Sequence, residues 1–399
     1  MLTVDRVVKQ LTLLPGDNTE AAVSFAIAKS VVDELAVDWA DPKTTILDPV
    51  CGRGMFLLAA YHRLIEHGHR PKHIIKNMLY GTDVNSLQCL IARRALKDLA
   101  GVEPNIEQAD SLTKEWNMEF SAVVGNPPYQ NGENSDFFKQ FIAKSQTLSK
   151  TVAFVVPATH FRTLKSFENI QKYRYLGSVF KGVYILTSWF VWNKDHKGAT
   201  TIYGDNGTTL IENEFVITPT DNLPAYQFVS GIVKRKLPGH TINSGNLHRR
   251  EVIEDPAGIK CIWGAGRRGE DLDWVMLSPG LADRLRGFGE HKVVFSGDTN
   301  TTSIGAMKYA DPTYGCANKA HYIRVNSEQE AANLIGYLES KFVTALIPQL
   351  KGMTTKNSVG VFNKIPSVDV SKAWTDTEIY DHFELAQDQI DYVELTNKE

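Results

Sequence analysis

The chain has 399 residues, 43% of them hydrophobic and 22% charged, with a formal net charge of −3. This length predicts two domains, and no run of apolar residues approaches the length of a transmembrane helix. Residues 1–16 lack the apolar core of a signal peptide, so we expect a cytoplasmic protein with no membrane partner. The four cysteines are scattered without a C-x-x-C pair, and no cluster of ligand residues indicates a metal site.

The charge is unevenly distributed along the chain. Residues 369–399 contain nine acidic residues and two lysines, whereas residues 234–268 contain eight basic and three acidic residues. The basic segment is compatible with a groove that faces phosphates. It is equally compatible with an ordinary solvated surface.

The first predicted elements surround a glycine-containing turn. A helix is expected from Thr19 to Leu35, with Asn18 or Thr19 as its cap. The β-branched run Thr44–Leu47 predicts a buried strand that ends at Asp48. Gly52 and Gly54 then open a second helix, which ends at Gly68.

The alternation of strands and helices continues through residue 156. Three further strands are expected to end at polar residues, which are Asp83, Asp110 and Asn126. Helices over 87–99 and 137–142 and a strand over 151–156 complete the pattern. This order predicts an α/β fold, a doubly wound and mostly parallel sheet with both faces covered. Ligands of such sheets bind beyond the carboxyl ends of the strands, where all these polar residues fall.

The alternation stops after Lys194. The apolar run Val183–Trp192 predicts a hairpin that closes the sheet, and residues 200–350 show short strand-like pieces without a βα rhythm. We therefore expect a catalytic domain over 1–210, a second, irregular α+β domain over 211–370, and an acidic helical segment over 371–399. The apolar residues of that last segment are expected to pack back onto a domain.

The first polar strand end predicts a cofactor site. Gly52 and Gly54 allow a tight turn and close approach of a ligand, but no third glycine follows, since Leu57 occupies that place. This favours a ligand without a pyrophosphate, such as S-adenosylmethionine. Asp48 would attract its cationic methionine portion, Asp83 would accept the ribose hydroxyls, and Asp110 the adenine amine. The alternative for each aspartate is a helix cap or turn former.

The segment Asn126-Pro127-Pro128-Tyr129 predicts a site for a planar amino group. The Asn126 side-chain oxygen and the Pro127 carbonyl can accept the two amine hydrogens, which frees the nitrogen lone pair for attack. The prolines hold these acceptors rigidly and Tyr129 offers a face for stacking, so the chemistry is positioning and electrostatics. The alternative is a rigid turn after a strand.

These motifs together resemble the N6-adenine DNA methyltransferases. The resemblance rests on Asp48-Pro49-Val50-Cys51-Gly52-Arg53-Gly54-Met55-Phe56-Leu57 followed by Asn126-Pro127-Pro128-Tyr129, and it covers residues 15–195. The order of the motifs is similar to the gamma class, in which a target-recognition domain follows the catalytic domain. The family implies the sheet of S-adenosylmethionine-dependent methyltransferases and transfer of a methyl group to adenine N6.

The resemblance also implies roles for individual residues. The cofactor would be bound by Thr19, Asp48, Pro49, Cys51, Gly52, Gly54, Asp83 and Asp110. The flipped adenine would be held by Asn126, Pro127, Pro128 and Tyr129, with Trp192 packing on its other face. At Thr19 the chain departs from the family, because a glutamate follows where many relatives have proline.

The implied substrate is double-stranded DNA with one base swung out of the stack. Loops of the second domain would contact the DNA through Lys234, Arg235, Lys236, Arg249, Arg250, Arg267 and Arg268. Whether a separate restriction endonuclease acts with the chain, and in which oligomeric state, is left open by the sequence.

Three other functions share parts of this pattern. An amine of RNA fits the same pocket, and so does the side-chain amide of a protein glutamine, although glutamine methyltransferases are shorter and place their extra domain first. A non-catalytic nucleic-acid binder would have no need of Asn126 with Gly52 and Gly54. No Pro-Asp followed by Glu-x-Lys or Asp-x-Lys at a suitable distance indicates a fused nuclease.

Overall fold

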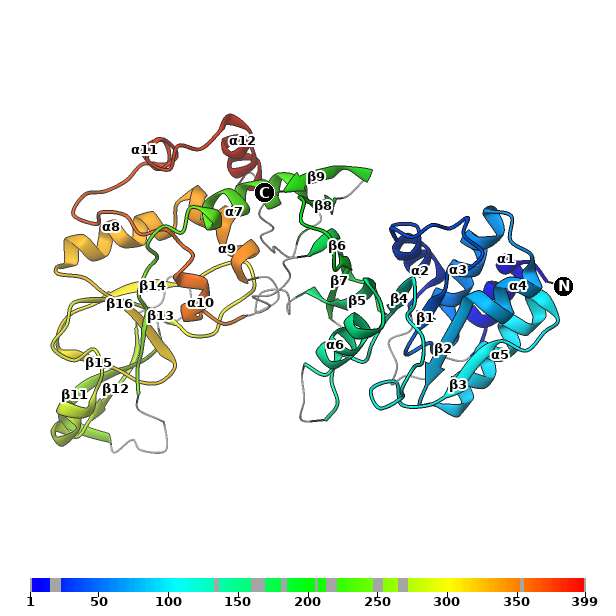
Figure 1. Ribbon diagram of the computed structural model, residues 1–399. Helices are drawn as coiled ribbons and strands as arrows, with labels where there is room; N and C mark the ends of the chain where they lie inside the picture. The colour runs from blue at the N-terminus through cyan, green and yellow to red at the C-terminus, as the bar shows by residue number, and fades with distance from the viewer. Residues whose placement is uncertain are drawn as a thin grey trace. The chain divides into compact units, whose positions relative to one another are not determined.

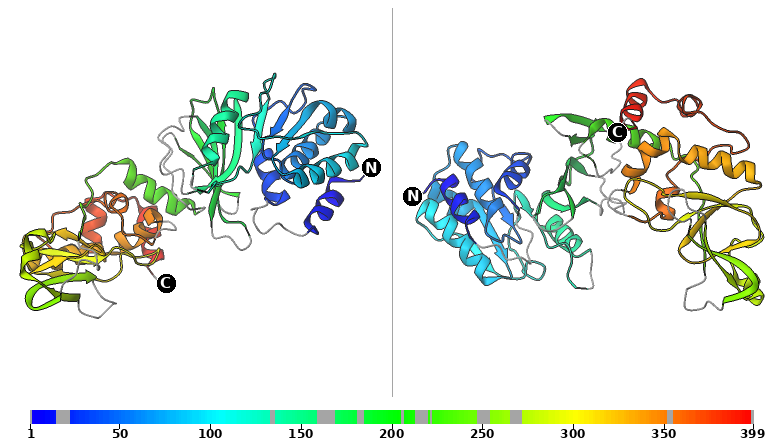
Figure 2. Two further views of the ribbon diagram at one scale, coloured as in Figure 1. Left: turned by 90° about the horizontal axis from the view of Figure 1, so that it is seen from below. Right: turned by 180° about the vertical axis from the view of Figure 1, so that it is seen from behind.

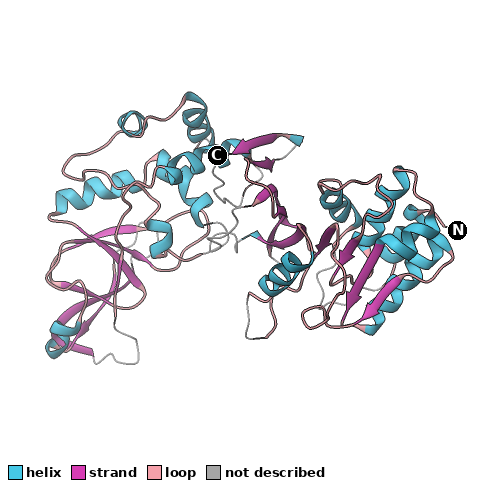
Figure 3. Ribbon diagram, viewed as in Figure 1, coloured by secondary structure: helices cyan, strands magenta, loops and turns pink. Residues whose placement is uncertain are grey.

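The computed structural model describes the chain in two compact units, Met1–Asp221 and Asn222–Glu399 (Figures 1 and 3). The residues described are 2–14, 23–132, 136–158, 169–180, 185–204, 207–212, 220, 222–246, 254–264, 272–351 and 355–397. Among the helices of these residues, none is both long and apolar enough to cross a membrane.

The first unit is built on a nine-stranded sheet with the order β3-β2-β1-β4-β5-β7-β6-β8-β9. Its strands are β1 (Ile46–Asp48), β2 (Leu79–Asp83), β3 (Asn105–Gln108), β4 (Ala122–Gly125), β5 (Thr151–Pro157), β6 (Ile170–Ser178), β7 (Leu186–Asn193), β8 (Thr200–Tyr203) and β9 (Thr209–Glu212). Strands β1 to β5 are parallel to one another, and β7 runs antiparallel between β5 and β6. The predicted doubly wound, mostly parallel sheet is confirmed; the apolar run predicted as a hairpin supplies the single strand β7, which pairs with β6, and the sheet continues to β8 and β9.

The helices of the first unit cover both faces of this sheet, which Figure 2 shows from two further sides. They are α1 (Val4–Thr12), α2 (Phe25–Val32), α3 (Met55–Glu66), α4 (Pro71–His73), the π-helical turn η1 (Ile74–Met78), α5 (Ser86–Ala100) and α6 (Phe138–Leu148). Side chains of α1, α2, α3 and α5 share one apolar cluster with Val124 and Val155. The alternate strand residues Val123 and Phe154 are buried as well but lie outside that cluster, and α6 contacts β5.

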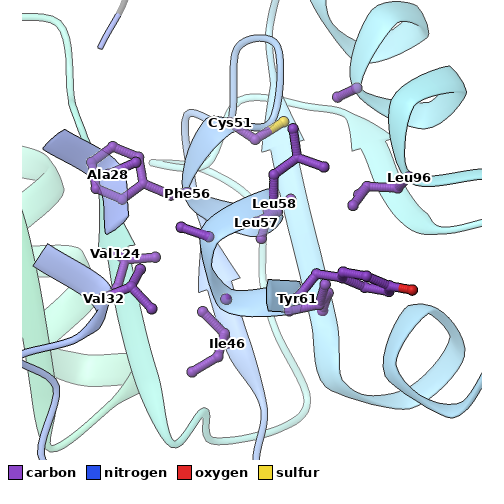
Figure 4. Packing of buried hydrophobic residues seen from close by; sticks show 14 of the residues in the cluster. Ala28, Val32, Ile46, Cys51, Phe56, Leu57, Leu58, Tyr61, Leu96 and Val124 are labelled. Atoms are coloured by element: carbon purple, nitrogen blue, oxygen red, sulfur yellow. The ribbon is translucent and has the colours of Figure 1, made fainter. Parts of the chain in front are cut away.

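Figure 4 shows how tightly the first βα unit is packed. Ala28 and Val32 of α2 and Phe56 of α3 pack with Ile46 of β1 and Val124 of β4, and all five are at most 3% exposed. Burial of a Val, Ile or Phe side chain of this kind contributes about 1.5–3 kcal/mol. This core fixes the ends of β1 and β4 relative to each other.

The main local difference from the prediction lies at the first helices. Helix α2 begins at Phe25, because the Ser24 side chain accepts a hydrogen bond from the Ile27 amide and caps it. The predicted caps Asn18 and Thr19 lie outside the described residues. Strand β3 ends at Gln108 rather than at Asp110, so Asp110 belongs to the following turn.

The second unit contains two smaller sheets. A four-stranded antiparallel sheet has the order β10-β16-β13-β14, and a three-stranded sheet has the order β12-β11-β15. The strands are β10 (Asn243–Ser244), β11 (Glu254–Gly264), β12 (Asp273–Leu277), β13 (Lys292–Ser296), β14 (Met307–Ala310), β15 (Tyr314–Cys316) and β16 (Ala320–Arg324). The predicted limit at residue 210 crosses β9, whereas the compact units divide at Asp221.

Helices and the four-stranded sheet form the main core of the second unit. The helices are α7 (Leu223–Lys234), the 3-10 helix η5 (Pro279–Arg284), α8 (Glu328–Leu338), α9 (Lys341–Lys351), α10 (Val359–Phe362), α11 (Asp376–His382) and α12 (Gln387–Thr396). Ile379 and Phe383 in and after α11 and Val393 of α12 are buried in this core. The prediction that the acidic terminal segment packs back onto a domain is confirmed.

Candidate active site

The turn after β1 is shaped for close approach of a ligand. Gly52 and Gly54 have φ values of +48° and +86°, which side chains with a Cβ adopt only under strain. The Gly54 amide donates to the Cys51 carbonyl at 2.7 Å, and the Cys51 amide donates to the Thr82 carbonyl of β2 at 2.8 Å. An ideal Cβ on Gly52 would have no atom within 4 Å, so the backbone there borders open space.

Asp83 joins the turns that follow β1 and β2. One of its carboxylate oxygens accepts from the Gly52 amide at 2.9 Å, and the other accepts from the Asn85 amide at 2.8 Å. Asn85 in turn caps α5 by accepting from the amides of Leu87 and Gln88. A carboxylate has about four lone-pair sites, so Asp83 retains acceptor capacity for two hydroxyl groups.

Asp48 is a buried carboxyl group at the end of β1. It is 1% exposed, and its Oδ1 atom accepts from the Val50 amide at 3.1 Å. Burial raises the pKa of Asp48 well above its ordinary value; the Val50 hydrogen bond opposes the rise and the charge of Asp83 adds to it. A cation placed near these two acids would be attracted and would favour the ionised form of Asp48.

The same environment makes Cys51 an unreactive thiol. Burial, followed by the charges of Asp48 and Asp83, raises the pKa of Cys51 well above its ordinary value. A thiol that stays protonated is a poor nucleophile. The surroundings of Cys51 thus disfavour its thiolate form.

The Asn126-Pro127-Pro128-Tyr129 segment follows β4 and lies directly beside Asp48. An ideal Cβ on Gly125 would be 2.8 Å from Asp48 Oδ1, so this position has room only for glycine. Asn126 and Tyr129 are half-buried, and the Tyr129 hydroxyl donates to Asn126 Oδ1 at 2.9 Å. Asp48, Gly52, Asp83 and Asn126, here called the strand-end cluster, thus come from three neighbouring strand ends.

Two aromatic rings meet beside Asn126. The centroids of Tyr129 and Phe180 are 6.2 Å apart with an interplanar angle of 58°, and Phe180 is buried. Burial raises the pKa of the Tyr129 hydroxyl, so it remains a hydrogen-bond donor. Phe180 was not predicted, because its position after β6 gives no local signal.

Pro49, Thr82 and Ser111 form a hydrogen-bond network under the site. The Pro49 carbonyl accepts from the hydroxyl groups of Thr82, at 3.1 Å, and of Ser111. The two hydroxyl groups are also 2.7 Å apart, and both residues are buried. Sequence reasoning missed Thr82 and Ser111, although their places directly before Asp83 and after Asp110 are a signal that could have found them.

Two further predicted site residues are Asp110, in the turn after β3, and Trp192, in β7. Asp110 is exposed and its Oδ1 atom accepts from the Leu112 amide at 2.9 Å, which is the geometry of a turn former. Trp192 is 9% exposed in β7 and is paired with Val152, near the amino end of β5. Because Asn126 follows the carboxyl end of β4, the stacking role predicted for Trp192 is not supported by its position.

Some of the predicted DNA-contacting residues lie outside the described residues. These are Arg249, Arg250, Arg267 and Arg268, and the same holds for Thr19 of the cofactor prediction. Lys234 ends α7, and Lys236 is exposed with a φ of +50°. Arg235 instead holds the terminal segment, because it donates to the Phe383 carbonyl and lies 3.8 Å from the Glu384 carboxylate.

The described part of the chain holds no group of three or more His, Cys, Asp or Glu side chains placed to bind a metal ion.

Comparison with known families identifies the domain that carries the strand-end cluster. The family model described as N-6 DNA Methylase matches residues 26–160. Residues 26–160 form an N-6 DNA methylase domain. The resemblance inferred from the two motifs is thereby confirmed.

Two curated relatives are each similar to a part of the chain. The chain is 36% identical over 105 residues to the type II methyltransferase M.VspI of Vibrio sp. (strain 343), which covers 24% of each chain. It is 28% identical over 126 residues to the type I restriction enzyme EcoEI methylase subunit of Escherichia coli, which covers 29% of this chain and 26% of the relative. The chain thus spans about a quarter of the length of the curated relatives it matches.

The fold is similar to that of the type IIL restriction-modification enzyme MmeI, whose structure was solved in complex with DNA. The TM-score is 0.50 at 13% sequence identity, with 100% of this chain and 73% of that chain covered. At this identity the likeness concerns the fold alone.

Proposed function

We propose that the chain transfers a methyl group from S-adenosylmethionine to the N6 amine of an adenine in duplex DNA. The observation that carries the proposal is the contact between two motifs, in which Gly125 leaves just enough space for the Asp48 carboxylate beside Asn126. Acids suited to a cationic cofactor therefore adjoin acceptors suited to a planar amine. The match of residues 26–160 to the N-6 DNA methylase family supports the reaction type.

The residues of the strand-end cluster fit S-adenosylmethionine. Asp48 and Asp83 supply negative charge for its ammonium and sulfonium groups, and Asp83 retains lone pairs for the ribose hydroxyls. Gly52 borders open space, so its backbone can approach the ligand without steric conflict. When bound, this cofactor supplies an electrophilic methyl group.

Asn126 and Pro127 would hold the target amine. Asn126 Oδ1 and the Pro127 carbonyl accept its two hydrogens, which turns the nitrogen lone pair out of the ring and toward the methyl group. Both acceptors are fixed before the substrate arrives, so the stabilisation of charge needs little reorganisation. The Tyr129 ring would stack on the base, and its hydroxyl must leave Asn126 Oδ1 or share it with the amine.

The substrate amine lies inside the duplex, so the adenine must be flipped out of the stack, which costs on the order of a few kcal/mol. We propose that residues 1–210 carry catalysis and that residues 211–370 recognise the DNA and offset this cost. The names of the two relatives, a type II methyltransferase and a type I methylase subunit, support a role in restriction-modification.

A transfer assay with labelled S-adenosylmethionine tests the proposal. The purified chain is incubated separately with duplex DNA, with RNA of the same sequence and with a protein extract, and the labelled product is hydrolysed and identified. We expect N6-methyladenine in DNA. Label in RNA alone would indicate an RNA amine methyltransferase, and label in glutamine would indicate a protein methyltransferase; either result contradicts the proposal. Sequencing of methylated sites in DNA from cells expressing the chain would then give the recognition sequence.

A further inference from the structure

The second unit contains a cavity whose lining includes three arginines. Its volume is about 350 Å³, and its lining includes Arg284, Arg286, Glu290, Tyr322 and Arg324, here called the arginine cavity. Three arginines and one glutamate give it a net positive charge. None of these arginines was singled out in the sequence, because they come from segments far apart in the chain.

The segment that carries Arg284 and Arg286 is held in place by one side chain. Asn246 donates from its Nδ2 atom to the Arg284 carbonyl at 2.7 Å, and its Oδ1 atom accepts from the Arg286 amide at 3.2 Å. The Arg286 carbonyl accepts from the Cys316 amide at 2.9 Å. The backbone of both arginines is therefore fixed before any ligand binds.

A glycine turn closes the other side of the arginine cavity. Gly287 has a φ of +78°, and an ideal Cβ on it would be 3.3 Å from both Lys292 Cδ and Tyr322 Cζ. The Gly289 amide donates to the Pro312 carbonyl at 2.8 Å. The turn is thus packed against Lys292 and Tyr322 at Gly287 and hydrogen-bonded to Pro312 at Gly289.

The charges around the cavity leave an excess of cations. Arg324 donates to Glu290 at 2.8 Å, yet its side chain is still 60% exposed. Below the cavity, Lys292 is completely buried and donates to the carbonyl groups of Glu290 and Asp311. Tyr322 is buried beside Arg324, and its hydroxyl proton has no acceptor among the described residues. An anion with several acceptor oxygens would complement this positive charge.

We propose that the arginine cavity binds a phosphate group of the DNA backbone. This inference rests on the proposed function, since it assigns a contact with the same substrate. Arginine presents planar, paired donors that match phosphate oxygens, and phosphate contacts hold a protein in register on a duplex without reading its sequence. The exposed Arg286 and Arg324 side chains lie where a long polyanion can reach them.

Salt-dependent binding to a mixed-sequence DNA duplex tests the proposal. Fluorescence anisotropy gives the Kd of the full chain at several salt concentrations. Arg286→Ala should weaken binding on the order of tenfold, as expected for a lost hydrogen bond to a charged group. It should also lower the slope of log K against log salt by about 1, equally for all sequences.

Lys372→Ala provides a control with the same loss of charge. Lys372 lies in the same unit, 51% exposed, and does not line the arginine cavity. We expect no change in Kd or in the salt slope. An Arg286→Ala variant that keeps the wild-type salt slope, or a control variant that loses as much, overturns the proposal.

Two further measurements separate DNA phosphate from other anions and this inference from the proposed function. Inorganic phosphate is titrated into the wild-type chain and into Arg286→Ala. If free phosphate binds tightly and only when Arg286 is present, while DNA binding is the same in both proteins, the ligand of the cavity is a small anion rather than DNA. That result overturns the proposal. If the wild-type chain transfers no methyl group to DNA yet the salt slope still depends on Arg286, the proposed reaction fails and the phosphate contact stands.

Discussion

The strand-end cluster and the arginine cavity are both preorganised, but by different means. Asp48 and Asp83 end strands β1 and β2 and Asn126 follows β4, all in the parallel part of one sheet, so the chain order itself brings them to one edge. The arginine cavity instead joins Arg284, which ends a 3-10 helix, and Arg286 to Arg324 at the end of an antiparallel strand. The candidate active-site residues of the first unit belong to local sequence motifs, whereas the cationic side chains of the arginine cavity come from segments that are distant in sequence.

This difference predicts how the two regions respond to mutation. In the strand-end cluster each residue has a geometric task, so single substitutions should cause large losses of activity. In the second unit single changes should alter DNA affinity or stability by smaller amounts. The following predictions test that contrast, beginning with the largest expected effect.

Asn126→Ala should lower methyl transfer by at least about 100-fold, because it removes a preorganised acceptor for the target amine. Binding of S-adenosylmethionine, measured by calorimetry, should be retained. Asn77→Ala is the control: Asn77 lies before β2, away from the carboxyl ends of the strands, and contacts His73. Near-normal methyl transfer by Asn126→Ala would contradict the catalytic role proposed for Asn126.

Gly125→Ala should reduce both cofactor binding and transfer, with a loss of turnover of about 10- to 100-fold. The new Cβ would be 2.8 Å from Asp48 Oδ1 and would push apart the two motifs. Gly336→Ala is the matched control, since an ideal Cβ on this glycine of α8 meets no atom within 4 Å. That control should keep full activity and gain about 0.5–1 kcal/mol of stability. Equal effects of the two variants would argue against the contact between the motifs.

Tyr129→Ala should cost about tenfold or more in kcat/KM, because stacking of a base on an aromatic ring contributes about 1–3 kcal/mol. Tyr129→Phe keeps the ring and removes only the hydroxyl that donates to Asn126 Oδ1. We expect this variant to stay within about threefold of the wild type. If both variants lose the same activity, the hydroxyl rather than the ring is the important group.

The smallest effect is expected in stability, at the buried Lys351 of the second unit. Its Nζ atom donates to Thr299, Ser303 and Asn357, each at 2.9 Å, and burial lowers its pKa to about 8. Between pH 8 and the ordinary pKa near 10.5, the unfolded chain binds more protons than the folded chain, so stability should rise with pH.

Urea unfolding at pH 8.0 to 9.5 measures this effect. The difference in unfolding free energy between the wild type and Lys351→Met should grow by about 1 kcal/mol over that range in favour of the wild type. A difference that is independent of pH would show that Lys351 does not titrate in this window.

The sequence predicted most of the strand-end cluster but only part of its surroundings. Asp48, Asp83 and Asn126 were accessible because a polar residue after a short apolar run marks a strand end. Asp110 was found by the same pattern, although β3 ends two residues earlier, whereas Trp192 was named by the family resemblance alone and lies in β7, paired with Val152. Phe180 contacts Tyr129 from a segment distant in sequence, which no local pattern encodes.

The second unit was less predictable for a related reason. A local excess of basic residues suggested Arg235, which donates to the Phe383 carbonyl and lies near the Glu384 carboxylate. The residues of the arginine cavity come from distant parts of the second unit, and the hydrogen bonds of Asn246 to Arg284 and Arg286 help to bring them together. Composition can indicate that a region is basic, but not which cations share one surface.

The contact between Gly125 and Asp48 changes how such a site should be searched for in other sequences. If the carboxylate after the first strand needs the space of a missing side chain, then Gly-Asn-Pro-Pro-Tyr is the relevant pentapeptide, and it is meaningful only together with the aspartate upstream. A chain with a larger residue before the asparagine would need a differently directed acid at the end of its first strand. The two motifs are therefore one compound signature, and a transplant of either alone into another scaffold should fail.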